Sequence, residues 1–293
     1  MVVGSVSVVG GKEKTAGRGN RTLIASLEGW SFTTKLCPQN QILITRPGFS
    51  VKAEEQNYLM TTATDPAEKE SLKAYAAPFV VFMLGLALVS AVQSFAPAEG
   101  APVWLADPKY WVYPLQTVIC GVLLVWFWKH YEWGKKWHVI TGIAVGLFVL
   151  ALWISPQWLF GAAPRTDGFN PDTFAEDPAL WWSTVALRFL RLVIIVPLLE
   201  EIFWRGFLMR YLIKEDFTKV PFGEFSVVSF AITTLMFGLA HYGPDFLPAI
   251  AACLIYNLVA VKTKSLACCV IAHAVTNLGL GLYIMQTKQW GFW

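Results

Sequence analysis

Charged side chains are scarce in this sequence, since Asp, Glu, Lys and Arg make up only 15% of its 293 residues. A typical soluble domain has about a quarter of its residues charged. Here 55% of the residues are hydrophobic, and 14 of them are tryptophans. The lack of charge argues against an ordinary soluble domain and predicts an integral membrane protein, provided that the apolar residues form long runs.

Basic patches and paired cysteines are also lacking. Residues 1–59 hold seven Lys or Arg and four Asp or Glu, which accounts for the whole net charge of +3, and the rest of the chain is neutral. No basic patch with interleaved aromatic residues occurs, so we expect no nucleic-acid partner. The five cysteines form no CxxC or zinc-ribbon spacing and are interpreted as small packing residues.

The apolar residues form seven long runs. Each is close to the roughly 17–25 residues that a helix needs to cross a bilayer, although one run is slightly short. Alternation of apolar and polar residues with frequent turns is absent, so helical spans are favoured over membrane strands. The sequence predicts an all-α, polytopic transmembrane bundle of about seven spans, at residues 75–95, 110–128, 139–157, 180–200, 225–241, 246–261 and 266–286.

The first 59 residues differ from the remainder. They are rich in Gly, Ser and Thr, are mixed in charge, and contain no apolar run long enough for a signal peptide. Met60 is followed by a polar stretch that leads directly into the first apolar run. We interpret residues 1–59 as a dispensable extension, disordered or arising from an over-called gene start, and residues 60–293 as the transmembrane domain.

The charges between the spans predict an orientation, because Lys and Arg near span ends are retained in the cytoplasm. Alternate loops contain only Lys109 and Arg165. The other loops contain Lys129, Lys135, Lys136, Arg205, Arg210, Lys214, Lys219, Lys262 and Lys264. This bias predicts a cytoplasmic N-terminus and an outside C-terminus. We expect the protein to lie in a bacterial inner membrane, in contact with membrane lipid.

The segment PLLEEIFWRGF (197–207) places charged residues at the end of an apolar run. Ionisable groups inside a membrane cost at least about 2.5 kcal/mol each at a helix centre, so they indicate either function or a buried pairing. Glu201 and Arg205 are four residues apart and can form an ion pair on one helix face. Glu200 lies about 100° away from that face. Pro197 removes a backbone donor and predicts a kink that opens the site to water.

Two further polar groups occur on later apolar runs. Phe237 and His241 share one helix face, as do His273 and Asn277, and Thr276 lies three residues after His273. Each group alone is compatible with structural hydrogen bonding between helices. Together with the glutamates they form an acid–base set distributed over three helices, which is hard to explain as packing.

The three motifs EExxxR, FxxxH and HxxxN, in this order, resemble those of the CAAX prenyl endopeptidase and bacteriocin-processing (CPBP, or Abi) family of intramembrane proteases. All are present without substitution over about residues 185–285. FWRGFLMRYLI and the ending NLGLGLYIMQTKQWGFW further resemble a bacterial branch associated with exosortase systems. The resemblance implies an enzyme whose membrane-embedded cavity cleaves a membrane protein or a lipidated peptide.

Our mechanistic hypothesis assigns a role to each polar residue. Glu200 is the general base for a water that His241 also holds, and His273 with Asn277 donates to the oxyanion. Glu201 paired with Arg205 fixes the electrostatics, and Phe237 forms a wall of the site. Zn²⁺ bound by Glu200, His241 and His273 is an alternative that the sequence leaves open, because two His and one Glu are a common catalytic zinc set.

Further interpretations remain at this stage. The polar constellation can belong to a non-enzymatic membrane scaffold or bacteriocin-immunity protein, or to a transporter that relays protons. Arg188 and Arg191 either bind a carboxylate or a lipid phosphate of a ligand, or extend their charges to the outer membrane surface. Polar loop 161–178 is predicted to be a solvated connector.

Overall fold

The computed structural model describes residues 22–27, 30–35, 66–95, 100–241 and 243–293. The chain divides into two units, 1–64 and 65–293. The first contains an antiparallel pair of strands, β1 (Thr22–Leu27) and β2 (Trp30–Lys35), in a register that places Thr22 opposite Lys35. The other residues of the predicted extension lie outside the described residues.

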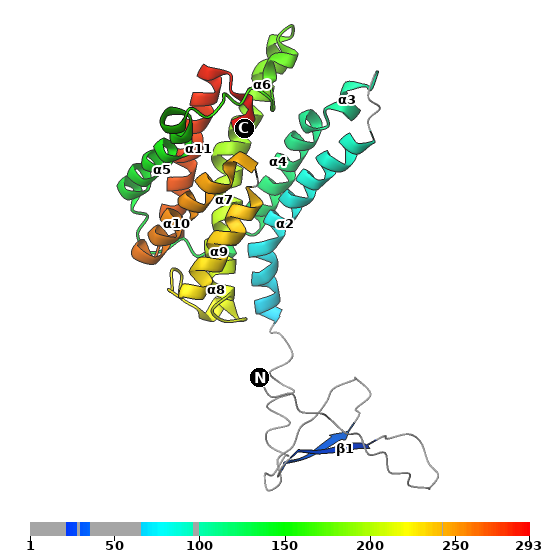
Figure 1. The fold of residues 1–293 in the computed structure, drawn as a ribbon, viewed down its shortest axis with the longest axis vertical. Coiled ribbons are helices and arrows are strands. Elements are labelled where there is room, and N and C mark those ends of the chain that lie inside the picture. The colour runs from blue at the N-terminus through cyan, green and yellow to red at the C-terminus, as the bar shows by residue number, and fades with distance from the viewer. Residues whose placement is uncertain (1–21, 28–29, 36–65, 96–99, 242) are drawn as a thin grey trace. The chain divides into compact units, whose positions relative to one another are not determined.

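The second unit is helical, as the sequence predicted (Figure 1). Its longer helices are α2 (Pro66–Ser94), α4 (Lys109–Trp126), α5 (Val139–Phe160), α6 (Pro178–Phe189), α9 (Val227–Ala240), α10 (Phe246–Thr263) and α11 (Leu266–Thr287). Shorter segments are α3 (Val103–Ala106), η1 (Trp128–His130), η2 (Pro171–Phe174), η3 (Leu190–Ile195), α7 (Val196–Glu201), η4 (Ile202–Leu208), α8 (Met209–Tyr211), η5 (Phe217–Lys219), η6 (Gly243–Asp245) and η7 (Trp290–Phe292).

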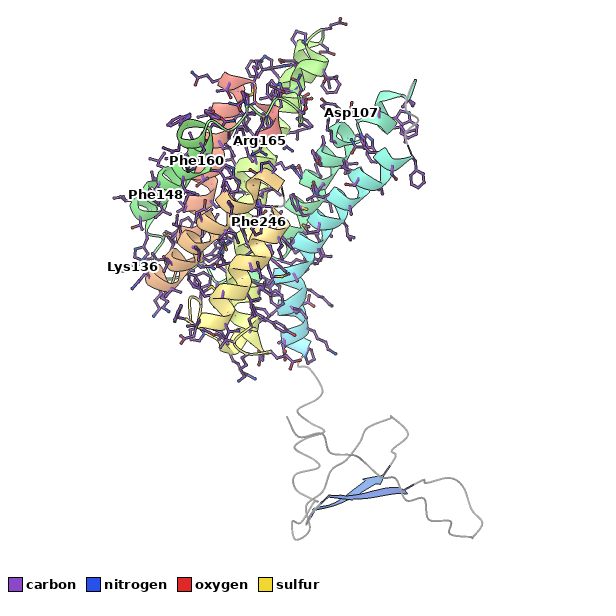
Figure 2. The ribbon with its side chains drawn as sticks, viewed as in Figure 1. Asp107, Lys136, Phe148, Phe160, Arg165 and Phe246 are labelled. Atoms are coloured by element: carbon purple, nitrogen blue, oxygen red, sulfur yellow. The ribbon has the colours of Figure 1, made fainter. Side chains whose placement is uncertain are left out.

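Helices lie at all seven predicted places. Among the described residues, five segments are long and apolar enough to cross a membrane: Pro66–Ser94, Val139–Phe160, Pro178–Tyr211, Gly243–Thr263 and Leu266–Thr287. Helices α4 and α9 are not among these five, and α9 has only 14 residues. The protein is therefore an integral membrane protein, and outward-pointing apolar side chains such as Phe148 and Phe160 suit contact with lipid (Figure 2).

The fourth span is longer than predicted. It extends to Tyr211, whereas the apolar run was expected to end at residue 200. Arg205 and Arg210, counted above as loop charges, are buried inside this continuous helical segment. Because buried and paired arginines are poor indicators of the cytoplasmic side, the charge bias becomes seven against two, and the orientation stays a prediction.

The helices form two groups around the fourth span. Figure 1 shows α5, α10 and α11 on one side of α7, and α2 with α4 on the other. Helices α5 and α11 pack closely because Gly142 and Gly146 have no side chain in the contact. The largest core cluster joins α2, α7 and η4 through residues such as Phe79, Leu199 and Trp204.

Capping residues set the starts of the helices that carry the predicted site. The Asp177 carboxylate accepts hydrogen bonds from the backbone N–H groups of Ala179 and Leu180, both at 3.0 Å, and so begins α6. Ser226 and Ser265 begin α9 and α11 in the same way. The start of α9 at Val227 shortens the fifth span.

The connector between α5 and α6 is fastened to two distant parts of the chain. Arg165 forms a bidentate ion pair with Asp245, at 2.6 and 2.7 Å, and donates to the carbonyl of Gly291 at 2.7 Å. Asp172 accepts from the Trp181 indole and from Lys288, both at 3.0 Å, and these bonds lower the pKa of its carboxyl. The connector is therefore held to other parts of the chain by ion pairs and hydrogen bonds, and is not only a solvated link.

Candidate active site

The fourth span changes its hydrogen-bonding pattern on both sides of the two glutamates. Helix α7, which carries them, lies between the π-helical segments η3 and η4. Pro197 is in the first turn of α7 and has no N–H to donate to the preceding turn, so an uninterrupted α-helical ladder is impossible there. The structure has π-helical turns here, which occur often at functional sites, and the kink itself stays a prediction.

Glu201 is the completely buried member of the glutamate pair. Its Oε1 accepts from Arg205 Nη1 at 3.1 Å and lies 2.9 Å from Nδ1 of His273. The predicted ion pair is confirmed, and both of its side chains are fully buried. One carboxylate oxygen therefore connects the first and third sequence motifs.

Arg205 is held by more groups than the sequence predicted. Its Nε donates to Oδ1 of Asn257 at 3.0 Å, its Nη2 lies 3.1 Å from Sγ of Cys253, and its guanidinium lies 5.1 Å from the ring centroid of Phe237. Asn257 was not predicted, although a lone amide in the apolar run 246–261 was a signal for it. A buried charge with this many partners is a fixed element of the structure.

Glu200 has a different environment from its neighbour. It lines a cavity of about 250 Å³ inside the bundle, and 6% of its surface is exposed. Its Oε2 is buried and, like Oε2 of Glu201, has no hydrogen-bond partner among the described residues. Glu201 is nevertheless paired through its Oε1, whereas no described residue forms a hydrogen bond or an ion pair with Glu200. The predicted contrast between a paired and a free carboxylate is confirmed.

His241 lies at the C-terminal end of α9 and lines the same cavity. Its Nδ1 is 2.9 Å from the carbonyl oxygen of Phe237, and the two rings stack with centroids 4.5 Å apart. A carbonyl can only accept, so Nδ1 carries the proton and Nε2 of the neutral ring has a free lone pair. The stacked Phe237 ring lines the cavity beside His241, as expected for the predicted wall.

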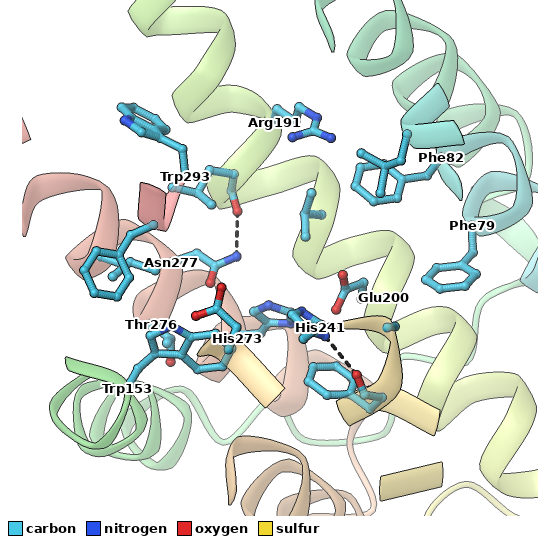
Figure 3. A pocket seen from close by; sticks show the side chains of 18 of the residues that line it. Phe79, Phe82, Trp153, Arg191, Glu200, His241, His273, Thr276, Asn277 and Trp293 are labelled. Atoms are coloured by element: carbon cyan, nitrogen blue, oxygen red, sulfur yellow. Dashed lines mark hydrogen bonds between the residues drawn. The ribbon is translucent and has the colours of Figure 1, made fainter. Parts of the chain in front are cut away.

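His273 and Asn277 line the cavity from α11 (Figure 3). The Glu201 contact orients the His273 ring through Nδ1, and no described residue hydrogen-bonds to its Nε2. Asn277 donates one amide hydrogen to the carbonyl of Leu192 at 2.9 Å, which leaves the second amide hydrogen for a ligand. The structure thus brings Glu200, His241, His273 and Asn277 to one cavity.

Thr276 also lines the cavity, but its hydroxyl is occupied. It lies 2.9 Å from the carbonyl of Gly146 and 3.0 Å from that of Ala272, and it accepts from the hydroxyl of Tyr256 at 2.7 Å. Trp153 lies edge-on to His241, with centroids 6.0 Å apart, and was not predicted from the sequence. We interpret both side chains as walls of the site.

The two arginines before the glutamates line the cavity as well. Arg188 and Arg191 are 5% and 7% exposed, so they do not extend their charges to the protein surface. The surface-directed interpretation of these residues is therefore wrong. The reason is that α4 and the C-terminal segment cover this part of the fourth span with aromatic side chains.

The three residues of the zinc alternative are not arranged as a metal site. No group of three His, Cys, Asp or Glu side chains within the described residues is arranged to hold a metal ion. Glu200, His241 and His273 line one cavity, yet their arrangement does not fit a shared ligand shell. The described geometry therefore gives no support to a zinc site.

Residues 181–279 match the family model described as "Type II CAAX prenyl endopeptidase Rce1-like". The match includes all three motifs and confirms the family resemblance over about a third of the chain. Comparison with curated proteins and with solved structures finds no match. The family match supports intramembrane protease activity in general, while the likeness to an exosortase-associated branch stays a prediction.

Proposed function

We propose that this chain, whose residues 181–279 match the Rce1-like prenyl endopeptidase family, hydrolyses a peptide bond of a membrane protein or lipidated peptide inside the bilayer. The observation that carries the proposal is the unpaired carboxylate of Glu200 in a cavity shared with His241, His273 and Asn277. A buried carboxylate without a partner costs free energy, so its presence favours a catalytic role over packing.

Glu200 and the free Nε2 of His241 bind the attacking water. The water donates one hydrogen to each acceptor, and Glu200 takes a proton as the oxygen attacks the substrate carbonyl. His241 keeps its orientation because Nδ1 is tied to the Phe237 carbonyl. A positioned general base contributes about 10²–10⁴-fold to the rate.

His273 and Asn277 stabilise the oxyanion that forms next. Asn277 offers its second amide hydrogen, and His273 offers Nε2–H when its ring carries both protons. Glu201 holds the His273 ring in place and is itself held by Arg205. Glu201 is thus a positioning residue, and no step of the mechanism uses a metal.

Glu200 returns its proton to the leaving amine when the tetrahedral intermediate collapses, which releases the two peptide products. The family description names prenylated substrates, so a prenylated peptide is the first substrate class to test. We further propose an inner-membrane location with a cytoplasmic N-terminus.

Comparative proteomics of membrane proteins tests the proposal and identifies the substrate in the same measurement. A deletion strain is complemented with the wild type, with Glu200→Ala, or with Glu176→Gln, an exposed carboxylate outside the cavity, as a control. We expect one uncut protein to accumulate in the deletion and Glu200→Ala strains only.

Identical membrane proteomes in all four strains would contradict protease activity. Rescue of the deletion phenotype by Glu200→Ala at normal membrane levels would instead favour a non-enzymatic scaffold or immunity protein.

A further inference from the structure

The cavity carries more positive than negative charge. Its acidic side chains are Glu200 and Asp245, and Asp245 is paired with Arg165 at 2.6 Å. Its two arginines, Arg188 and Arg191, form no ion pair with any acid in the part of the chain that the structure describes. Two buried cations therefore face a single free carboxylate, and a ligand that brings an anion would balance the charge.

Arg188 presents hydrogen-bond donors that nothing in the described chain uses. Its Nε and Nη1 are buried and without partners. Aromatic rings surround its guanidinium, with centroids 5.2 Å away for Tyr113, 4.9 Å for Phe169 and 5.2 Å for Trp293. The rings stabilise the cation and hold its plane, but they supply no acceptor, and buried N–H donors without an acceptor are rare.

Arg191 lies beside Arg188 and, unlike it, is held by side-chain hydrogen bonds. Its Nε and Nη2 both donate to Oε1 of Gln116, at 3.1 and 2.9 Å. Its guanidinium lies 4.2 Å from the ring centroid of Tyr113, the same ring that contacts Arg188. Tyr113 therefore joins the two guanidiniums in one subsite, with Nη1 of Arg191 left for a ligand.

We propose that Arg188 and Arg191 bind a carboxylate of the substrate peptide. A guanidinium presents two parallel N–H groups that match the two oxygens of a carboxylate. This inference rests on the proposed peptidase function, because it assigns the cation pair to the same peptide that Glu200 cleaves.

The subsite also predicts where the carboxylate lies along the peptide. Arg191 precedes Glu200 by nine residues, which corresponds to a rise of at most about 14 Å, because Leu190–Ile195 is π-helical and rises less per residue than an α-helix. An extended peptide spans about 3.3 Å per residue, so the carboxylate lies no more than about four residues from the bond that is cleaved. A chain-terminal carboxylate and an acidic side chain both supply this chemistry.

Binding of labelled probes to the full chain in detergent tests the subsite apart from catalysis. Every binding measurement uses a chain that carries Glu200→Gln, so that the probe is not cleaved. The probes are a fluorescent S-farnesyl pentapeptide with a free terminal carboxylate, its terminal amide, and the amide with one glutamate four residues after the farnesylated cysteine. Fluorescence anisotropy measures Kd for each. Arg188→Met is compared with Lys109→Met, which removes a cation outside the cavity.

We expect at least one carboxylate probe to bind about tenfold or more tightly than the plain amide. The preferred probe identifies the source of the carboxylate. Arg188→Met is expected to reduce the ratio of these two Kd values to near one, and Arg188→Lys to reduce it in part. Lys109→Met is expected to leave the ratio unchanged. Thermal melting of each variant confirms that it is folded.

An unchanged preference in a folded Arg188→Met variant would overturn the proposal, as would equal Kd values for all three probes when both arginines are present. Binding that depends on phosphatidylglycerol in nanodiscs and on Arg188, but not on the probe carboxylate, would assign the subsite to a lipid phosphate instead. If carboxylate preference is present while the proteomes of the Glu200→Ala and wild-type strains are identical, the subsite stands and the protease function fails.

Discussion

Two adjacent glutamates of the fourth span have opposite environments. Glu201 is fully buried, and its Oε1 contacts Arg205 and His273. Glu200 lines the cavity, and no described residue pairs with its carboxylate. A helix turns about 100° per residue, so neighbouring side chains necessarily face different surroundings. The same residue type is therefore structural at one position and available for chemistry at the next.

Substitutions at these two positions should separate stability from activity. Glu200→Gln removes a buried unpaired carboxylate, so we expect the melting temperature to stay equal or to rise while cleavage is lost. Arg205→Met leaves Glu201 without its cation, and breaking a buried pair costs about 3–5 kcal/mol. Thermal melting in detergent, together with cleavage of the uncut protein found by proteomics, measures both effects. A lower melting temperature for Glu200→Gln than for Arg205→Met would contradict these assignments.

At the scale of elements, the contact between α5 and α11 positions the third motif. A Cβ atom at Gly146 would lie 2.5 Å from the carbonyl oxygen of Ala272 and 2.7 Å from Cβ of Val275. The Gly146 carbonyl also lies 2.9 Å from the hydroxyl of Thr276, which precedes Asn277 in the cavity wall. Gly146, together with Gly142, therefore permits the close approach of the two helices and helps to place Asn277.

Gly146→Ala should weaken both packing and activity. The helices must separate to admit the methyl group, and overpacking of this kind costs about 1–3 kcal/mol. Gly121→Ala is the matched control, because a Cβ there meets only Cδ1 of Ile195 at an ordinary 3.4 Å. We expect a lower melting temperature and slower cleavage for Gly146→Ala only. Equal melting curves for the two variants would show that the α5–α11 contact adapts freely.

At the scale of the whole molecule, the site belongs entirely to one of the two units. Residues 65–293 form a compact unit that contains the core clusters, the cavity and all three motifs. The described part of the first unit is the β1–β2 pair. A unit with its own core does not depend on the preceding chain for its fold.

A chain that begins at Met60 should therefore fold and act like the full chain. We expect the same melting temperature, because the second unit has a hydrophobic core of its own. We also expect the same rescue of the deletion strain, since every residue of the site is retained. Membrane levels of the two forms, measured by immunoblot, serve as the control. Loss of rescue at equal membrane levels would assign a function to residues 1–59.

Composition and residue spacing were enough to predict much of this protein's fold and many of its candidate site residues. Long apolar runs with little charge determined the helical membrane fold, and four-residue spacings predicted the Glu201–Arg205 and Phe237–His241 contacts, because side chains at that spacing are neighbours on a helix face. The candidate residues of the three motifs were likewise visible without coordinates.

Only the tertiary structure decided what lies between these helices. The bond from Glu201 to His273 and the Asn257 support of Arg205 join segments far apart in the chain, whose relative depth no spacing predicts. The burial of Arg188 depends on aromatic rings from α4 and the C-terminal segment. Its neighbours in the sequence therefore could not show that its charge is buried instead of extending to the surface. Pairing and burial of a charge depend on what packs against it, and that is a property of the assembled bundle.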